Sequence, residues 1–263
     1  MSGEFSTAWL TLREPADADA RAADLLEALH TALGDRAKPV IRDLGCGAGS
    51  LSRWLGPKLG GPHHWVLEDR DPDLLAYAAA HPPPGASVET RVGDVTQLTA
   101  ADLDGTDLVT CSALLDLLTA DEVAELARVC AQARCAALFT LSVVGKVSFD
   151  PADPRDAAVT EAFNAHQRRT VDGRRLLGPD APEAAAAAFA AHGAKVTVRP
   201  SPWRLGPERA TLTEQWLQGW VGAAAEQQPE LGLDAYLDER LAALRAGNLR
   251  ATVGHADLLA IFN

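Results

Sequence analysis

Three glycines in one short stretch would let a ligand approach the main chain closely. The stretch Val40–Ser50 reads VIRDLGCGAGS, in which an apolar run leads into Gly45, Gly47 and Gly49. Glycine has no Cβ, so it tolerates positive φ angles and leaves space for a ligand. The segment Leu51–Leu59 follows at helical spacing, and the free N–H groups of its first turn face the same space. We interpret the stretch as a strand, a ligand-binding turn and a helix.

Carboxylates and small residues follow at the places where further strands are expected to end. Asp69 stands twenty residues after Gly49, Asp94 follows the third expected strand, and Cys111-Ser112 follow the fourth. In an open α/β sheet the ligand lies beyond the carboxyl ends of the strands. A carboxylate at Asp69 could accept both hydroxyl hydrogens of a ribose. A carboxylate at Asp94 could accept an adenine amino hydrogen, while the Val95 N–H could donate to a ring nitrogen.

The glycine spacing differs from the dinucleotide-binding fingerprint G-x-G-x-x-G. It reads D-L-G-C-G-A-G, with Asp43 two places before the first glycine. This pattern resembles motif I of the class I S-adenosylmethionine-dependent methyltransferases. The segment VLEDRDP is similar to the ribose-binding motif of that family, RVGDV to its adenine motif and DLVTCSALLDLL to its fourth-strand motif. The resemblance covers roughly Arg13–Leu141 and the final strands.

The resemblance implies S-adenosyl-L-methionine as the cofactor and methyl transfer as the reaction. It also implies which residues bind the cofactor: Asp43, Gly45, Cys46, Gly47, Gly49, Asp69, Arg70, Asp94, Val95, Cys111 and Ser112. The backbone around Gly45 and Cys111 would hold the methionine ammonium. The methionine carboxylate would face the helix start or Arg13, although a solvated surface charge is the preferred interpretation of Arg13. Glu68 could exchange roles with Asp69, which matches the family position better.

The expected elements alternate between strands and helices, which predicts a doubly wound, mostly parallel α/β sheet. The resemblance makes this a seven-stranded, Rossmann-like methyltransferase fold with a reversed last strand, in a single domain over 1–263. Residues 1–36 are expected to form an arm, up to about Ala16, and a helix over Asp17–Leu33. Residues 145–180 and 203–254 are expected to be helical insertions that form a cap on the substrate side. The expected strands are Val40–Leu44, His64–Leu67, Ser87–Val92, Thr106–Thr110, Ala136–Val144, Lys195–Arg199 and Ala256–Phe262.

Two residues outside the cofactor motifs are candidates for catalysis. His166 is the best candidate for a general base, because imidazole titrates near neutrality; a surface histidine is the alternative. Asp116 lies six residues past the end of the fourth strand, where this family often presents a substrate contact; a solvated carboxylate is the alternative. Trp216 and Trp220 share a helix face. We interpret them as packing residues, on the domain or on the partner subunit of a homodimer, rather than as an aromatic pocket.

The composition and charge of the chain limit the kinds of partner that it can be expected to bind. The formal net charge of −12 argues against a nucleic acid, which is bound mainly by Lys and Arg. The four cysteines show no metal-type pairing, and no magnesium or other metal site is expected. No run has the length of a membrane span and the start shows no signal-peptide pattern, so a cytoplasmic location is expected. We interpret the chain as a small-molecule methyltransferase with an oxygen or nitrogen acceptor. The alternatives are a nucleic-acid or protein methyltransferase, a non-catalytic S-adenosylmethionine-binding protein, and an aminopropyl transferase.

Overall fold

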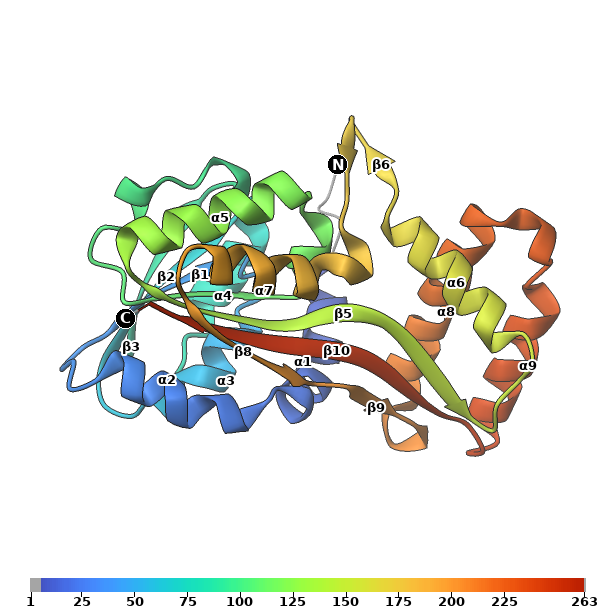
Figure 1. The fold of residues 1–263 in the computed structure, drawn as a ribbon. Helices are drawn as coiled ribbons and strands as arrows, with labels where there is room; N and C mark the ends of the chain where they lie inside the picture. The colour runs from blue at the N-terminus through green and yellow to red at the C-terminus, as the bar shows by residue number, and fades with distance from the viewer. Residues whose placement is uncertain (1–5, 263) are drawn as a thin grey trace.

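The core of the protein is a twisted sheet whose strands run in the order β3-β2-β1-β4-β5-β10-β8 (Figure 1). The computed structural model describes residues 6–262. The first five strands pair in parallel, and β10 runs antiparallel to β5 and β8. The predicted seven-stranded sheet with a reversed last strand is therefore confirmed. The strands are β1 (Val40–Leu44), β2 (His63–Asp69), β3 (Ala86–Val92), β4 (Leu108–Ser112), β5 (Ala136–Asp150), β8 (Lys195–Pro200) and β10 (Arg250–Ile261), with the short β9 (Trp203–Leu205) also paired to β10.

Helices cover both faces of this sheet. On one face lie α2 (Leu26–Leu33), α3 (Ser50–Leu59) and α4 (Pro72–Ala80), and on the other lie α5 (Ala120–Ala133) and α7 (Ala181–Ala191). Side chains cap two of the helix starts. Asp71 caps α4 by accepting the Asp73 N–H at 2.9 Å, and Thr119 and Glu122 form a capping box at the start of α5. These starts lie at the sheet edge where β2 and β4 end.

A helical cap is built on strands that run past the sheet. Beyond the end of β4, β5 and β10 continue as a ribbon that the short β9 joins on the other side of β10, and α6 (Asp156–Gln167), α8 (Ala210–Gln227) and α9 (Asp234–Arg245) pack around it (Figure 1). Trp216 and Trp220 stack at 5.6 Å, and Phe149 of the ribbon lies 5.4 Å from Trp220. The interpretation of both tryptophans as packing residues within the domain is confirmed. The predicted end of one strand at Val144 and the predicted start of another at Ala256 were each wrong by six residues. Glycines and polar residues interrupt the apolar pattern of the ribbon, so the sequence did not indicate that these strands continue.

The N-terminal arm was also predicted wrongly. Residues Thr7–Ala20 form a helix, α1, where an arm was expected up to about Ala16, and Pro15 lies inside this helix. Proline costs one intrahelical hydrogen bond. The apolar side of α1 packs against the cap through Trp9, Leu12 and Ala16, and this burial offsets the cost. The predicted single helix over Asp17–Leu33 is broken at Arg21-Ala22, between α1 and the short turn Ala23–Leu25.

A small hairpin that the sequence analysis did not predict stands beside the cap. It consists of β6 (Thr170–Val171) and β7 (Arg174–Arg175), joined by Asp172 and Gly173, which both have positive φ. Short 3-10 turns complete the described chain: Ala23–Leu25 (η1), Val95–Gln97 (η2), Ala100–Leu103 (η3), Leu115–Leu117 (η4), Gly178–Asp180 (η5), Pro207–Arg209 (η6) and Pro229–Leu231 (η7).

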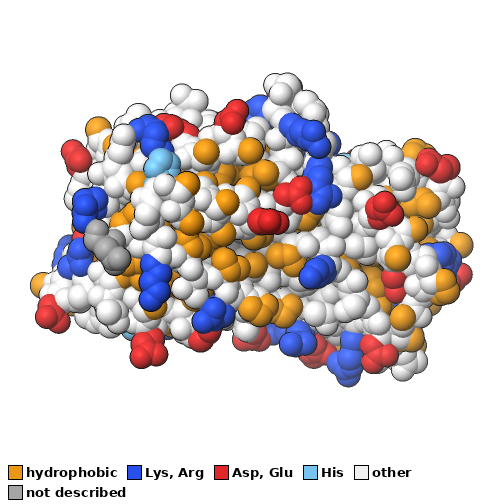
Figure 2. All heavy atoms as spheres, viewed as in Figure 1, with side chains coloured by type: hydrophobic (Ala, Val, Ile, Leu, Met, Phe, Trp, Pro, Cys, Tyr) orange, Lys and Arg blue, Asp and Glu red, His pale blue; other side chains and the backbone are white. Residues whose placement is uncertain are grey.

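The surface mixes charges of both signs. Figure 2 shows Lys and Arg side chains interspersed with Asp and Glu around the rim of this face, with hydrophobic side chains gathered over its centre. Among residues 6–262, no helix has the length and apolar character that crossing a membrane requires. Within the same residues, no three His, Cys, Asp or Glu side chains gather as a metal site needs.

Candidate functional site

The glycine turn after β1 has the geometry of a ligand cradle. Gly45, Gly47 and Gly49 have φ of 57°, 52° and 81°, so side chains would be strained at all three positions. A Cβ added to Gly45 would lie 3.0 Å from the side chain of Leu114, and one added to Gly47 would lie 3.1 Å from that of Leu10 in α1. The Cys46 N–H donates to the Glu68 carbonyl at 2.9 Å, which ties the turn to the end of β2. The turn therefore lies between the carboxyl ends of the strands and α1.

Asp69 stands at the end of β2 and faces the glycine turn. Its carboxylate accepts the Gly47 N–H at 2.8 Å and the Asp71 N–H at 3.0 Å. Glu68 is committed elsewhere, because its buried carboxylate pairs with the guanidinium of Arg42 at 2.5 Å. This arrangement favours Asp69 over Glu68 for the ribose. Arg70, the next residue, is exposed.

Asp94 lies on the neighbouring strand end. Asp69 pairs with Val92 in the β2–β3 register, and the Gly93 N–H donates to the Asp69 carbonyl at 3.0 Å. The Asp94 carboxylate accepts the N–H and the hydroxyl hydrogen of Thr96, each at 2.9 Å, and so caps the short turn that begins at Val95. The structure thus brings Asp69, Asp94 and the glycine turn to one edge of the sheet.

Asp43 lies beneath the turn, fully enclosed by protein. Its Oδ1 accepts the hydroxyl hydrogen of Thr110 at 2.7 Å, and its Oδ2 has no hydrogen-bond partner. Burial raises the pKa of this carboxyl to about 7, although the Thr110 hydroxyl and the positive charge of Arg21 act in the opposite direction. Asp43 therefore changes protonation near neutral pH.

Arg21 is a functional candidate that the sequence analysis missed. It lies just after α1 and is 4% exposed. Its guanidinium donates to the hydroxyl oxygens of Ser50 at 3.0 Å, Ser112 at 3.2 Å and Thr140 at 3.4 Å, which stand at the start of α3 and near the ends of β4 and β5. Nη1 has no hydrogen-bond partner, and burial lowers the pKa of the group. A buried cation with an unpaired donor is an anion site, but nothing in the local sequence DADARAAD distinguishes this arginine from a surface residue.

Arg13 is not the solvated charge that was expected. Its guanidinium pairs with the buried carboxylate of Asp17 at 3.0 Å and lies 4.8 Å from the centre of the Trp203 ring. The Trp203 Nε1–H also donates to Asp17, at 2.9 Å. His255 packs beside Trp203, and burial lowers its pKa to about 3, so its imidazole is neutral. This cluster joins α1 to β9 and β10.

The end of β4 forms the remaining wall of the site. Cys111 is buried, and burial raises the pKa of its thiol well above the ordinary value, which fits a packing residue. Ser112 accepts hydrogen bonds from Arg21 and from the hydroxyl of Thr140. Ala113 has a φ of 51°, an unusual conformation for a non-glycine residue. Asp116 lies half-buried in the turn Leu115–Leu117, on the same edge of the sheet.

His166 lies apart from this edge, on α6 of the cap. Its Nε2 is 3.2 Å from the carboxylate of Glu226 on α8, and its Nδ1 is 3.3 Å from the guanidinium of Arg169. Both ring nitrogens therefore have protein partners. Nearby arginines are also paired, Arg168 with Asp180 at 2.6 Å and Arg174 with Glu122 at 2.7 Å.

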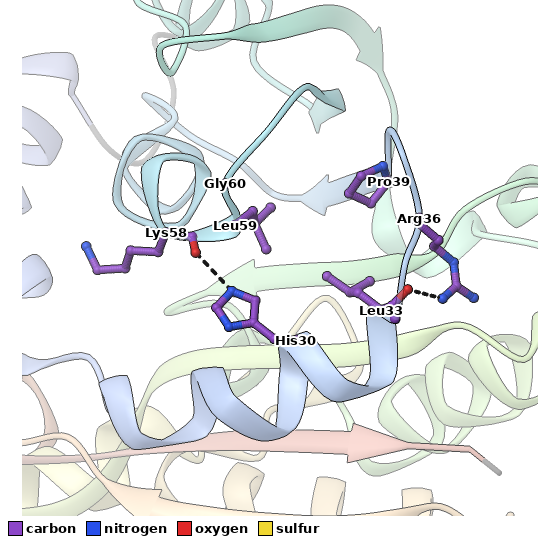
Figure 3. Close-up of a pocket in the computed structure, with 8 residues that line it drawn as sticks. His30, Leu33, Arg36, Pro39, Lys58, Leu59 and Gly60 are labelled. Carbon is purple, nitrogen blue, oxygen red and sulfur yellow. Dashed lines mark hydrogen bonds between the residues drawn. The ribbon is translucent and has the colours of Figure 1, made fainter.

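Two further cavities lie outside the carboxyl edge. One of about 300 Å³ lies between the ends of α2 and α3, at the opposite edge of the sheet (Figure 3). Its polar side chains serve helix ends: His30 is 2.9 Å from the Lys58 carbonyl oxygen, and Arg36 donates to the Leu33 carbonyl. The other, of about 540 Å³, lies between the ribbon and α6. It is lined by Gly145, Lys146, Val147, Ala157, Thr160, Glu161, Asn164, Ala165 and Arg168.

Comparisons with known proteins agree with this geometry. Residues 41–133 match the family model of a methyltransferase domain. The biotin biosynthesis bifunctional protein BioCD of Bordetella avium (strain 197N) is 33% identical over 132 residues, which is 50% of this chain. The match takes in 27% of the length of that relative.

Solved structures share the fold. The cyclopropane synthase MmaA2 from Mycobacterium tuberculosis has a TM-score of 0.52 at 14% identity, covering 98% of this chain and 95% of its own. The mycolic acid cyclopropane synthase CmaA1, crystallised with S-adenosylhomocysteine and CTAB, has a TM-score of 0.51 at 15% identity, covering 90% and 83%. The protein BH2331 from Bacillus halodurans C-125 has a TM-score of 0.50 at 16% identity, covering 91% of this chain and 98% of its own.

The fold and the matched motifs define the class of this protein. A seven-stranded sheet with a reversed last strand carries a glycine turn and two acidic strand ends at one edge, within the matched methyltransferase domain. Residues 41–133 are therefore a methyltransferase domain, and S-adenosylmethionine is its cofactor. The residues of the edge fit that cofactor: a Cβ at Gly45 or Gly47 would crowd the side chain of Leu114 or Leu10, so only glycine keeps the main chain accessible there, and Arg21 holds a buried donor without a partner.

Proposed function

We propose that this enzyme transfers the methyl group of S-adenosylmethionine to a small-molecule acceptor with an oxygen or nitrogen nucleophile. The observation that carries the proposal is the convergence of four groups on one edge of the sheet. These are the glycine turn, the carboxylates of Asp69 and Asp94, and the buried guanidinium of Arg21. Together they offer acceptors for a nucleoside and a cation for a carboxylate.

Each group has a distinct task in this proposal. Asp69 accepts the ribose hydroxyl hydrogens, and Asp94 with the Val95 N–H recognises the adenine. The ionised Asp43 favours the positive charge of the methionine ammonium above the turn. Arg21 binds the methionine carboxylate, a role first considered for Arg13. The cofactor supplies, when bound, a methyl group on a positively charged sulfur. The protein's own contribution is alignment of the acceptor and exclusion of water.

The acceptor is proposed to enter from the cap side. Asp116 stands past the end of β4 on the same edge as Ser112, and we assign it a contact with the acceptor. The cavity of about 540 Å³ beside Gly145 has the size of a small-molecule site and lies on the strand that continues from Thr140. The net charge of −12 and the mixed charges in Figure 2 support a small acceptor over a nucleic acid.

The test is methyl transfer from isotopically labelled S-adenosylmethionine in a metabolite extract, followed by mass spectrometry. Wild-type protein should label a low-molecular-weight product, and Asp69→Ala, the matched control with weakened cofactor binding, should label it far more weakly at a cofactor concentration that saturates only the wild type. Labelling of protein or nucleic acid in an unfractionated lysate, with no labelled small molecule, would overturn the small-molecule proposal.

A further inference from the structure

Asp257 is a buried carboxylate that the proposed cofactor contacts do not use. It lies on β10 and is 1% exposed. It accepts the N–H of Leu141 at 2.8 Å, the N–H of Ala22 at 2.8 Å and the hydroxyl hydrogen of Ser201 at 2.5 Å. A buried carboxylate is costly unless donors satisfy it, and these three donors do so.

The three donors belong to segments where regular structure is interrupted. Leu141, within β5, has a φ of 57°, which is a strained conformation for a branched side chain. Ala22 lies in the break between α1 and the turn Ala23–Leu25. Ser201 lies between β8 and β9, and its N–H donates to the His255 carbonyl. A strained conformation persists where surrounding contacts fix it, and Asp257 supplies such a contact at Leu141 and a hydrogen bond at each of the other two places.

Two of these positions adjoin the proposed carboxylate site. Ala22 directly follows Arg21, and Leu141 directly follows Thr140, whose hydroxyl accepts from the Arg21 guanidinium at 3.4 Å. Asp257 therefore fixes the backbone next to Arg21 and also the backbone next to Thr140, one of the hydrogen-bond partners of Arg21. The other partners of Arg21, Ser50 and Ser112, belong to different segments of the chain.

We propose that Asp257 is a positioning residue for cofactor binding. It fixes Arg21 relative to the ends of β4 and β5, so that the guanidinium meets the carboxylate of the methionine tail. The inference rests on the proposed role of Arg21. It assigns to Asp257 an effect on the amino-acid tail of the cofactor and none on the nucleoside.

The test compares two ligands that share the nucleoside. S-adenosylhomocysteine carries the amino-acid tail, and 5′-methylthioadenosine lacks its carboxylate and ammonium. For Asp257→Asn, calorimetry should show about tenfold weaker binding of S-adenosylhomocysteine, the scale of one hydrogen bond to a charged group, with 5′-methylthioadenosine unchanged. An equal loss for both ligands, or no loss for either, would overturn the proposal.

The matched control is Asp107→Asn at the opposite edge of the sheet. Asp107 also accepts a backbone N–H, from Val40 at 2.9 Å, and pairs with Arg36. This substitution should lower the melting temperature and leave the ratio of the two affinities unchanged. Ser201→Ala, which removes one donor and keeps the carboxylate, should shift the ratio in the same direction by a smaller factor. It serves as the test if Asp257→Asn fails to fold.

A double-mutant cycle with Arg21→Met separates positioning from a general structural effect. In the Arg21→Met background, Asp257→Asn should cause no further loss of S-adenosylhomocysteine affinity, because the group that it positions is gone. An undiminished tenfold loss in that background would contradict the proposal. Failure of the wild-type protein to bind S-adenosylhomocysteine would instead contradict the proposed function itself.

Discussion

The cofactor edge and the cap are stabilised in different ways. At the cofactor edge, buried charged groups retain atoms without partners, such as Nη1 of Arg21 and Oδ2 of Asp43. The backbone there also adopts positive φ at Ala113 and Leu141. In the cap, charged groups pair with one another around a core of stacked aromatic rings, as Arg240 does with Asp156, and the buried atoms without partners include Nε of Arg240 and Nε1 of Trp220.

We interpret this difference as a separation of residues kept for binding from residues kept for packing. Unpaired charges and strained backbone cost stability, and at the edge we propose that a ligand completes them. The cap carries four more charges that are already neutralised, in the pairs Arg155–Asp153 and Arg168–Asp180. Substitutions in the cap should therefore change stability, and substitutions at the edge should change cofactor binding.

The largest expected effect is on the cap. Trp220→Ala removes a buried ring that contacts Phe149, Phe163, Trp216 and Tyr236. The free energy of unfolding should fall by about 3–5 kcal/mol, the range for a buried aromatic residue. Denaturant unfolding measures this loss. Below the transition, the affinity for S-adenosylhomocysteine should stay within about threefold of wild type, since the ring touches no residue of the edge. A large loss of affinity in the folded variant would contradict the claim that the cap affects stability and the cofactor edge affects binding.

At the cofactor edge, Asp69→Ala should weaken cofactor binding by about 1.5–3 kcal/mol, the scale of hydrogen bonds to a charged group. The carboxylate also holds the Gly47 N–H at 2.8 Å, so its loss loosens the turn as well. Calorimetric titration measures the change, with Asp73→Ala on the exposed first turn of α4 as the control. Wild-type affinity in Asp69→Ala would remove Asp69 from the ribose site.

The protonation of Asp43 should make cofactor binding depend on pH. Burial raises the pKa of this carboxyl from 3.8 to about 7, and only the ionised form favours the positively charged cofactor. Affinity should therefore weaken about tenfold from pH 8 to pH 6, with proton release on binding near pH 7. The folded protein without cofactor binds this proton more tightly than the unfolded chain, so this contribution to stability falls as pH rises from about 4 to 7.

The control for this prediction is Asp43→Asn. Its affinity and its stability should lose the pH dependence assigned to Asp43, measured by titration at several pH values and by unfolding over the same range. A wild-type affinity that is flat between pH 6 and pH 8 would show that Asp43 does not titrate at the site.

The smallest effect is expected for His166→Ala. The sequence made His166 the best candidate for a general base, with a surface histidine as the alternative, and the structure engages its ring nitrogens with Glu226 and Arg169 in the cap. We therefore expect turnover within about threefold of wild type and unchanged cofactor affinity, measured with the labelled-methyl assay once an acceptor is known. A loss of turnover by two orders of magnitude or more at unchanged affinity would support the base assignment and place part of the chemistry in the cap.

The same difference explains what the sequence could predict. The candidate site residues at the cofactor edge could be predicted from the sequence because they follow local patterns. Glycines must adopt positive φ there, and carboxylates stand at the ends of apolar strands. Asp71 and Thr119 marked helix starts for the same local reason. Arg21 was not readable, since its burial depends on Ser50, Ser112 and Thr140, which are distant in sequence. The helix around Pro15 and the ribbon of β5 and β10 were missed because tertiary packing overrides local propensity there.

The most direct measurement of the central claim is the binding of S-adenosylhomocysteine to the wild-type protein and to Arg21→Met by calorimetry. If the carboxyl edge is the cofactor site, the wild type binds one equivalent and Arg21→Met binds it at least about tenfold more weakly, with 5′-methylthioadenosine bound equally by both. Equal affinity of the two proteins for S-adenosylhomocysteine, or no binding by the wild type, would contradict the assignment.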